Sequence, residues 1–277
     1  MKTIVTLLAI LLSMACCNLT GPASGNTKLN ETYGPNTRNK MDVYLPNVHD
    51  TTTKVVVLIH GGGWVAGNKT DWAAEVINLL KAEGYAVAAM NYRYADGDFH
   101  HQMQDVQMAI DYINSKAATW KIGTNRFALI GGSAGAHLSL LYAHGFDSVN
   151  VVKAVVSLAG PSDMSDPVFH QYANNYSIGY VFEQFLGATV QNNPQVYEDA
   201  SPVNYHQPTP TLLIHGSLDN LVPPSHSQMM FDTLQTYGIT TDTTFFGNAG
   251  HDVLGPNGVN KNQIYGEIKS WLQLYLH

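Results

Sequence analysis

A glycine-rich turn between an apolar strand and a helical pattern constrains this chain more than any other feature. Residues 127–141 read FALIGGSAGAHLSLL, so a short buried-strand run leads into Gly131-x-Ser133-x-Gly135 and then into leucines at helical spacing. This spacing is that of a nucleophile elbow, in which the sharp turn lifts a serine hydroxyl clear of the sheet. Residues flanking the strained apex pass too close for a Cβ atom, which explains the glycines. The motif alone is also compatible with a phosphate-binding turn or with a turn that only serves packing. A catalytic role therefore requires a base, an acid and oxyanion donors elsewhere in the chain.

A second glycine cluster follows an earlier apolar strand. The segment HGGGW at 60–64 comes directly after the continuously apolar run Val55–Ile59 of the expected strand. Glycines at this place let backbone amides point at a substrate oxygen, as in the oxyanion loops of lipases and esterases. We expect the amides of Gly62, Gly63 and Ala134 to form an oxyanion hole. A phosphate loop would instead need a helix N-terminus followed by Lys or Ser/Thr.

The base of a serine nucleophile is expected in the loop that precedes the last helix. The chain has 12 histidines, so composition alone selects none of them. His251 lies in the small-residue segment GNAGHD at 247–252, after the expected last strand, where it can reach Ser133. Structural or solvated positions are expected for five others: His60, His137, His215, His100 and His101.

The acid that orients His251 is expected after a late strand and before that histidine in sequence. Asp219 follows the expected strand at 211–215 in a tight polar loop. Asp252 is adjacent to His251 and would point away from it, and Asp163 is a weaker alternative after an earlier strand. Asp219 could also serve simply as a turn residue.

Four motifs occur in a fixed order: HGGGW, GGSAGA, HGSLDNLVP and AGHD. Together they resemble the hormone-sensitive-lipase-like and related small microbial carboxylesterases of the α/β-hydrolase superfamily, over residues 41–277. The resemblance implies an α/β-hydrolase fold, the triad Ser133, His251 and Asp219, and no cofactor or metal. The chain has no room for the large N-terminal helical cap of many such enzymes. Acetyl, feruloyl and xylan-debranching esterases with a bare N-terminus look closer.

Alternating strand and helix patterns predict a mostly parallel central sheet with helices on both faces. Strands are expected at 40–45, 54–60, 85–91, 127–130, 151–158, 211–215 and 243–246, and helices at 73–83, 98–116 and 263–275. We expect one catalytic domain, 40–277, in which 160–207 forms a small helical insertion over the site. Residues 18–39 are polar and are expected to be a tether that leads into an edge hairpin.

The N-terminus predicts export from the cytoplasm. Lys2 and the short apolar core at 4–12 are typical of a signal peptide, and Cys16 follows in LSMAC, which resembles a bacterial lipobox with Ser13 in place of the usual Leu. We therefore expect residues 1–17 to be a signal segment, Cys16 to be lipidated, and the protein to be a periplasmic or cell-surface lipoprotein. The alternative is ordinary cleavage and secretion. Cys16 and the adjacent Cys17 are the only cysteines, so no internal disulfide framework is expected.

Charge and composition restrict the classes of molecule that this protein can bind. The net charge is −7, without a basic run, which argues against nucleic acid, and a lipid anchor is the expected membrane contact. The expected partner is a small-molecule or carbohydrate ester. The sequence predicts a carboxylic ester hydrolase for short-chain, aryl or carbohydrate-linked esters, with an exopeptidase, an arylformamidase or a non-catalytic binding protein as alternatives.

Aromatic side chains are expected to line the substrate pocket, and Trp64 and Tyr92 are the main candidates. The insertion at 160–207 mixes aromatic with polar residues and has few long aliphatic runs, which predicts an aromatic and polar rim suited to short acyl groups or a planar acid. The other aromatic candidates are Tyr94, Tyr172, Tyr176, Tyr180 and Phe182.

Overall fold

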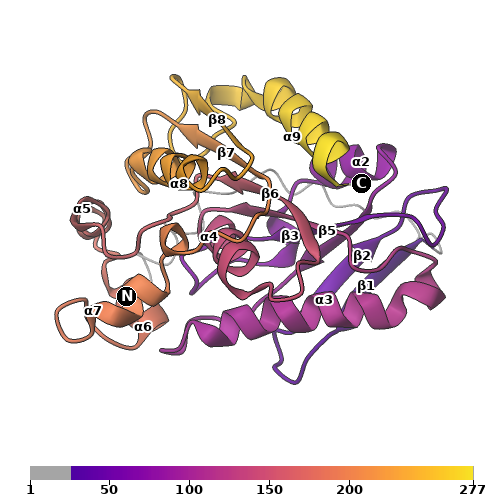
Figure 1. Ribbon diagram of the computed structural model, residues 1–277, viewed down its shortest axis with the longest axis horizontal. Coiled ribbons are helices and arrows are strands. Elements are labelled where there is room, and N and C mark those ends of the chain that lie inside the picture. The colour runs from indigo at the N-terminus through magenta and orange to yellow at the C-terminus, as the bar shows by residue number, and fades with distance from the viewer. Residues whose placement is uncertain (1–25, 277) are drawn as a thin grey trace.

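Eight strands form one mixed sheet in the computed structural model, which describes residues 26–276 (Figure 1). The strands are β1 (Thr27–Thr32), β2 (Lys40–Tyr44), β3 (Val55–Ile59), β4 (Ala86–Met90), β5 (Phe127–Gly132), β6 (Val152–Leu158), β7 (Thr211–Gly216) and β8 (Thr241–Phe246). Their order across the sheet is β1-β2-β4-β3-β5-β6-β7-β8. The pairs β1–β2 and β2–β4 are antiparallel and all later pairs are parallel. The predicted mostly parallel sheet is confirmed.

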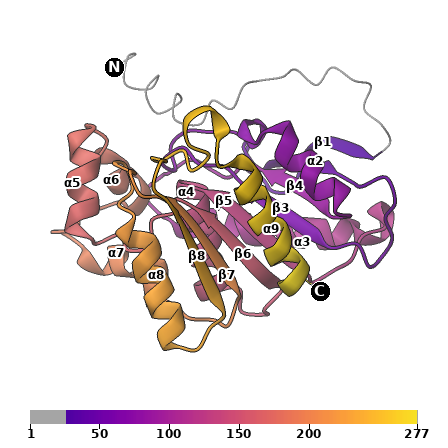
Figure 2. The same cartoon turned by 90° about the horizontal axis from the view of Figure 1, so that it is seen from above.

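Helices cover both faces of the sheet (Figure 2). They are α2 (Ala74–Ala82), α3 (His100–Trp120), α4 (Ala134–Leu141), α5 (Pro167–Asn175), α6 (Tyr180–Leu186), α7 (Pro194–Asp199), α8 (Ser225–Thr236) and α9 (Lys261–Tyr275). One apolar core lies between the sheet and α2 with α9, and a larger core lies between the opposite face and α3, α4 and α8. Strands β3, β4 and β5 are buried along their whole length, as expected for a sheet covered on both sides.

The expected helical insertion consists of α5, α6 and α7 between β6 and β7, which lie together beyond one end of the sheet (Figures 1 and 2). Local sequence explains where two of these helices begin. Asp166 and Asn193 accept hydrogen bonds from the first-turn amides of α5 and α7, and each is followed by a proline, which suits the first helical position. Helix α6 ends at Gly187, which has a left-handed conformation.

Two expectations about the chain need correction. Residues 27–32 belong to the sheet as β1, so a tether cannot extend to residue 39. An edge strand needs no apolar face on its open side, and the polar composition of TKLNET therefore hid it. Helix α8 has no counterpart in the sequence prediction, because only His226, Ser227, Met230 and Leu234 along it are buried. The expected signal segment at 1–17, with Cys16, lies outside the described residues.

No helix within residues 26–276 is both long enough and apolar enough to cross a bilayer.

The elbow brings the backbones of β5, α4 and β3 very close together. A Cβ atom on Gly131 would lie 2.2 Å from the carbonyl oxygen of Gly135, and one on Gly135 would lie 2.1 Å from the carbonyl oxygen of Ile59. These neighbours are backbone atoms of β3 and α4, so they cannot rotate away as a side chain can. The two glycines therefore let α4 start directly against the end of β3.

We predict that Gly135→Ala destabilises the protein by about 3 kcal/mol or more, because the added methyl group overlaps fixed backbone. The control is Gly266→Ala in α9, where an added Cβ atom meets nothing within 4 Å. That substitution should stabilise the helix by up to about 1 kcal/mol. Urea unfolding of both variants measures the difference, and equal stability of Gly135→Ala and the parent protein would contradict this account of the elbow.

Candidate active site

Ser133 occupies the apex of the turn between β5 and α4. Its backbone angles, φ 53° and ψ −121°, lie in a region that non-glycine residues rarely adopt. The conformation is held from both sides, because its amide donates to the carbonyl of Leu158 at 2.8 Å and its carbonyl accepts from the amide of His137 at 3.0 Å. Such local strain is characteristic of residues placed for function, and here it exposes the hydroxyl at the end of the sheet.

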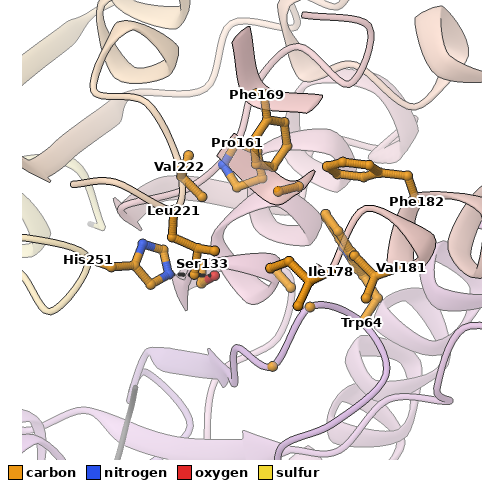
Figure 3. A pocket seen from close by; sticks show the side chains of 14 residues that line it. Trp64, Ser133, Pro161, Phe169, Ile178, Val181, Phe182, Leu221, Val222 and His251 are labelled. Atoms are coloured by element: carbon orange, nitrogen blue, oxygen red, sulfur yellow. Dashed lines mark hydrogen bonds between the residues drawn. The ribbon is translucent and has the colours of Figure 1, made fainter. Parts of the chain in front are cut away.

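The three predicted triad side chains meet at this end of the sheet. His251 Nε2 lies 2.9 Å from Ser133 Oγ, and His251 Nδ1 lies 2.8 Å from Asp219 Oδ2 (Figure 3). The side chain of His251 is 3% exposed and that of Asp219 is fully buried. These partners select the tautomer in which Nδ1–H donates to the carboxylate and Nε2 accepts from the serine hydroxyl. The arrangement can therefore remove a proton from Ser133.

The carboxylate of Asp219 is fully hydrogen-bonded. Its Oδ1 accepts from the amides of Leu221 at 2.9 Å and Val222 at 3.0 Å, and its Oδ2 accepts from both His251 and His215. Burial by itself raises the pKa of Asp219, but the hydrogen bonds from His215 and His251 outweigh burial and hold that pKa well below its usual range. Asp219 is therefore an anion that faces the imidazole.

His215 supports the acid loop, as its position at the end of β7 suggested. Its Nε2–H is shared between Asp219 Oδ2 and the carbonyl of Val222, each at 3.1 Å, and the Ser227 hydroxyl donates to its Nδ1 at 2.7 Å. The side chain is completely buried. Ser227 thereby favours the tautomer of His215 that donates to Asp219, and α8 takes part in orienting the acid.

The two alternative acids do not contact His251. Asp163 Oδ1 accepts from the amide and hydroxyl of Ser165, and Asp252 Oδ1 accepts from the amide of Leu254. Both carboxylates close local turns in their own loops. Of the candidate acids, only Asp219 is in place to orient the histidine.

The predicted oxyanion loop lies beside Ser133. Gly62 and Gly63 have φ values of 110° and 57°, and a Cβ atom on Gly62 would lie 2.3 Å from the carbonyl oxygen of Ala66. The amides of Gly62, Gly63 and Ala134 donate no hydrogen bond within residues 26–276, and all three residues border the cavity next to Ser133. Unpaired amides beside a nucleophile are suited to bind the oxygen of a tetrahedral intermediate.

Tyr92 lies beneath the oxyanion loop and not in the cavity, so its expected contact with substrate is wrong. The side chain is fully buried and stacks on His60, with ring centroids 4.3 Å apart. Its hydroxyl donates to the carbonyls of His60 at 3.1 Å and Gly61 at 3.2 Å. The position just after β4 directs Tyr92 into the core, where it supports the loop from behind.

Arg38 is a supporting residue that the sequence did not single out. Its guanidinium donates to the carbonyls of Tyr92 at 2.8 Å and Gly67 at 3.0 Å and lies 3.3 Å from His60 Nε2. It also sits over the ring of Tyr94, 3.6 Å from the centroid. Because Arg38 belongs to the polar stretch expected to be a tether, nothing local marked it. Through these contacts Arg38 packs against the side of the oxyanion loop that faces away from Ser133.

A small apolar cavity adjoins Ser133; His251 borders it at one end, and Trp64, Val181 and Phe182 lie on the other side of Ser133 (Figure 3). The space open to the centre of a water molecule is about 50 Å³. The oxyanion loop contributes Trp64, the acid loop contributes two residues, and the insertion with the segment before it contributes six. The acid-loop residues are Leu221 and Val222, and the others are Pro161, Phe169, Ala173, Ile178, Val181 and Phe182.

The expected polar character of the rim is wrong for the inner cavity, whereas its aromatic character is confirmed by Trp64, Phe169 and Phe182. Among the aromatic candidates, only Trp64 and Phe182 line it. The insertion is polar in composition, but its short helices turn their few apolar side chains inward: Phe169 and Ala173 from α5, and Val181 and Phe182 from α6. The polar residues of these helices face outward, so overall composition misrepresented the lining.

Comparison with known proteins places this geometry in context. Residues 41–234 match the sequence model of the family BD-FAE. The chain is 27% identical over 262 residues to "Isoprenylcysteine alpha-carbonyl methylesterase ICME" of Arabidopsis thaliana, covering 86% of this chain and 60% of that protein. It is 28% identical over 225 residues to "Esterase LipC" of Mycobacterium tuberculosis, covering 73% and 54% respectively. The chain thus spans little more than half the length of these curated relatives.

Solved structures share the fold. A "Bifunctional GH43-CE" of Bacteroides eggerthii superposes with a TM-score of 0.74 at 25% identity, over 87% of this chain and 38% of that one. A "Truncated form of carbohydrate esterase from gut microbiota" superposes with a TM-score of 0.70 at 24% identity, over 90% and 99%. These likenesses confirm the α/β-hydrolase fold that the four motifs implied.

Buried histidines make stability depend on pH. Burial lowers the pKa of His60 to about 3 and the pKa values of His137 and His144 to about 4. In the unfolded chain each would titrate near about 6.5. Between these values the unfolded state binds protons that the folded state does not, so stability falls as the pH falls.

We predict that the free energy of unfolding drops between pH 6 and pH 4.5, with each buried histidine contributing up to about 1.4 kcal/mol per pH unit. Urea unfolding across this range measures the slope. His144→Gln should remove about one proton from the slope, because the buried imidazole of His144 then no longer takes up a proton on unfolding. A slope of zero in the parent protein would show that these imidazoles are not held neutral.

Proposed function

Since this chain belongs to the BD-FAE family of α/β-hydrolases, we propose that it is a serine carboxylic ester hydrolase for short acyl groups on polar alcohols such as sugars. The observation that carries the proposal is the continuous chain of contacts from Asp219 through His251 to Ser133, beside unpaired amides. A nucleophile, a base, an orienting anion and oxyanion donors within one site are the parts that acyl transfer requires.

The geometry defines the order of events. Ser133 Oγ attacks the ester carbonyl while its proton passes to His251 Nε2, and Asp219 stabilises the resulting imidazolium. The carbonyl oxygen becomes an oxyanion, which the amides of Gly62, Gly63 and Ala134 receive. Collapse of this intermediate breaks the bond to the alcohol oxygen, which takes the proton from His251. Water then repeats the sequence on the acyl-enzyme and releases the carboxylic acid.

The alcohol and acyl parts of the ester experience different surroundings. The leaving oxygen must lie next to His251 Nε2 to receive its proton, and we place the acyl group in the part of the apolar cavity bordered by Trp64, Val181 and Phe182. Two structural neighbours, a carbohydrate esterase and a bifunctional GH43-CE protein, support the carbohydrate character of the alcohol. The curated relatives are named as esterases as well.

We predict that Ser133→Ala lowers kcat on a simple aryl acetate by on the order of a million-fold while the protein stays folded. His251→Ala should be nearly as damaging, and Asp219→Asn somewhat less so. Asp163→Asn is the control, because that carboxylate does not contact His251. Rates on parallel ester, anilide and formamide substrates identify the bond that is cleaved. Retained activity in Asp219→Asn together with loss in Asp163→Asn would overturn the assignment of the acid.

We further propose that the enzyme is exported and anchored through a lipid on Cys16, with the following polar residues as a short tether. Acyl chains on that cysteine contribute about 0.8 kcal/mol per buried methylene to membrane binding. The native protein should then partition into the detergent phase, and Cys16→Ser should move it into the aqueous phase. A mature N-terminus cut beyond Cys17 in fully soluble native protein would disprove the anchor.

A further inference from the structure

We propose that Trp64 sets the maximum length of the acyl group, and that His137 holds Trp64 in place by tying it to the end of the helical insertion. The inference rests on the proposed esterase function and assigns the part of the site that selects the acid. It concerns two buried side chains that take no part in the transfer of protons at Ser133.

The acyl chain has one direction available to it. With the leaving alcohol near His251 and the oxyanion at Gly62 and Gly63, the remaining substituent of the carbonyl carbon points into the part of the cavity that lies on the other side of Ser133 from His251. Figure 3 shows Trp64, Val181 and Phe182 on the side of Ser133 opposite His251. An acyl chain that grows from Ser133 therefore approaches these side chains.

Among the residues at this end of the cavity, Trp64 is packed tightly against the core. Its ring lines the cavity but is only 2% exposed, and it stacks on Phe185, with centroids 4.6 Å apart and planes 13° apart. Phe185 is fully buried and does not line the cavity, so the space behind Trp64 is already filled by core. A longer acyl chain cannot move the indole backward without breaking close packing.

His137 fixes the orientation of the indole. The Trp64 Nε1–H donates to His137 Nδ1 at 3.2 Å, and His137 Nε2–H donates to the carbonyl of Ala200 at 2.8 Å. Both bonds require a neutral imidazole protonated on Nε2, and burial, which lowers the pKa of His137 to about 4, keeps the ring in that form at neutral pH. His137 is on the elbow helix α4, and Ala200 caps the C-terminus of α7.

Trp64 is thereby linked to three segments: the oxyanion loop, helix α4 through His137, and the end of helix α7 through Ala200. Trp64 follows the oxyanion loop directly, so its position is tied to the amides that receive the oxyanion. It also has a left-handed backbone conformation, φ 61°, which is unusual for a large side chain and shows that the surroundings impose its position. The space beside Ser133 open to the centre of a water molecule is only about 50 Å³, which favours acetyl to butyryl groups over octanoyl groups.

The experiment compares Trp64→Leu with Trp120→Leu. Trp120 is a buried tryptophan of α3, 5% exposed, that packs on Tyr112 and does not line the cavity. Each protein is first titrated with a fluorophosphonate probe to count reactive serines. Then kcat/KM is measured on p-nitrophenyl acetate, butyrate, hexanoate and octanoate and on methyl ferulate. Failure of the parent protein to react with the probe would refute the proposed function itself, whereas the chain-length profile of a reactive protein tests Trp64.

We expect the parent protein and Trp120→Leu to prefer acetate and butyrate. Trp64→Leu should raise the ratio of octanoate to acetate activity by about tenfold or more, the scale at which a hydrophobic pocket discriminates. Trp64→Phe serves as a milder truncation if Trp64→Leu does not fold, and it should shift the limit in the same direction. A reactive Trp64 variant with the parent profile, or a parent protein fastest on octanoate, would overturn the proposal.

The role of His137 is tested with a matched pair. His137→Leu removes the acceptor for the indole N–H and should broaden the acyl profile. His137→Gln retains an acceptor and a donor at similar positions and should restore the narrow profile. If His137 had only a structural role, His137→Leu would lower all rates together. An unchanged ratio of octanoate to acetate activity in His137→Leu would therefore refute the proposal that His137 positions Trp64.

Discussion

The site depends on the backbone contact between the elbow and the neighbouring strand. A Cβ atom on Gly135 would overlap the carbonyl oxygens of both Ile59 and His60, so only glycine allows α4 to begin against the end of β3. This contact joins two loops that are far apart in sequence. The nucleophile follows β5 and the oxyanion loop follows β3, and these strands pair directly in parallel. The proposed oxyanion donors and the proposed nucleophile therefore meet because β3 and β5 are neighbours in the sheet.

Buried histidines that use both ring nitrogens in hydrogen bonds are the second recurring feature of the site. His60, His137 and His215 each join two or more segments through both ring nitrogens, around the oxyanion loop, the acyl cavity and the acid loop respectively. An imidazole that both donates and accepts can bridge a carbonyl and a donor inside the core, which neither a lysine nor a leucine can do. The bridges at His60 and His137 require an uncharged ring. A site organised in this way is rigid near neutral pH and loses stability in acid.

The sequence was informative where chemistry requires a local backbone shape. The elbow glycines, the glycines after β3 and the small residues around His251 could be interpreted from spacing, because their roles follow from close approach and chain direction. Tyr92, Arg38 and the cavity lining could not be predicted in the same way. Tyr92 is directed inward by a strand end, Arg38 acts across 54 residues on Tyr92, and the apolar faces of α5 and α6 are each only a few residues long. These features depend on tertiary packing, which leaves little trace in composition.

The placement of Trp64 suggests how acyl selection and catalysis are coupled in this chain. Trp64 directly follows Gly63 in sequence, contacts the insertion through Phe182 and Phe185, and is bonded to the elbow helix through His137. A change in the insertion that moved the indole would therefore also move the amide of Gly63, so a wider cavity obtained by shifting the backbone would weaken oxyanion binding. Truncating the indole leaves the backbone in place and separates the two effects. Acyl specificity in this site should consequently be easier to change by substituting side chains than by remodelling the insertion.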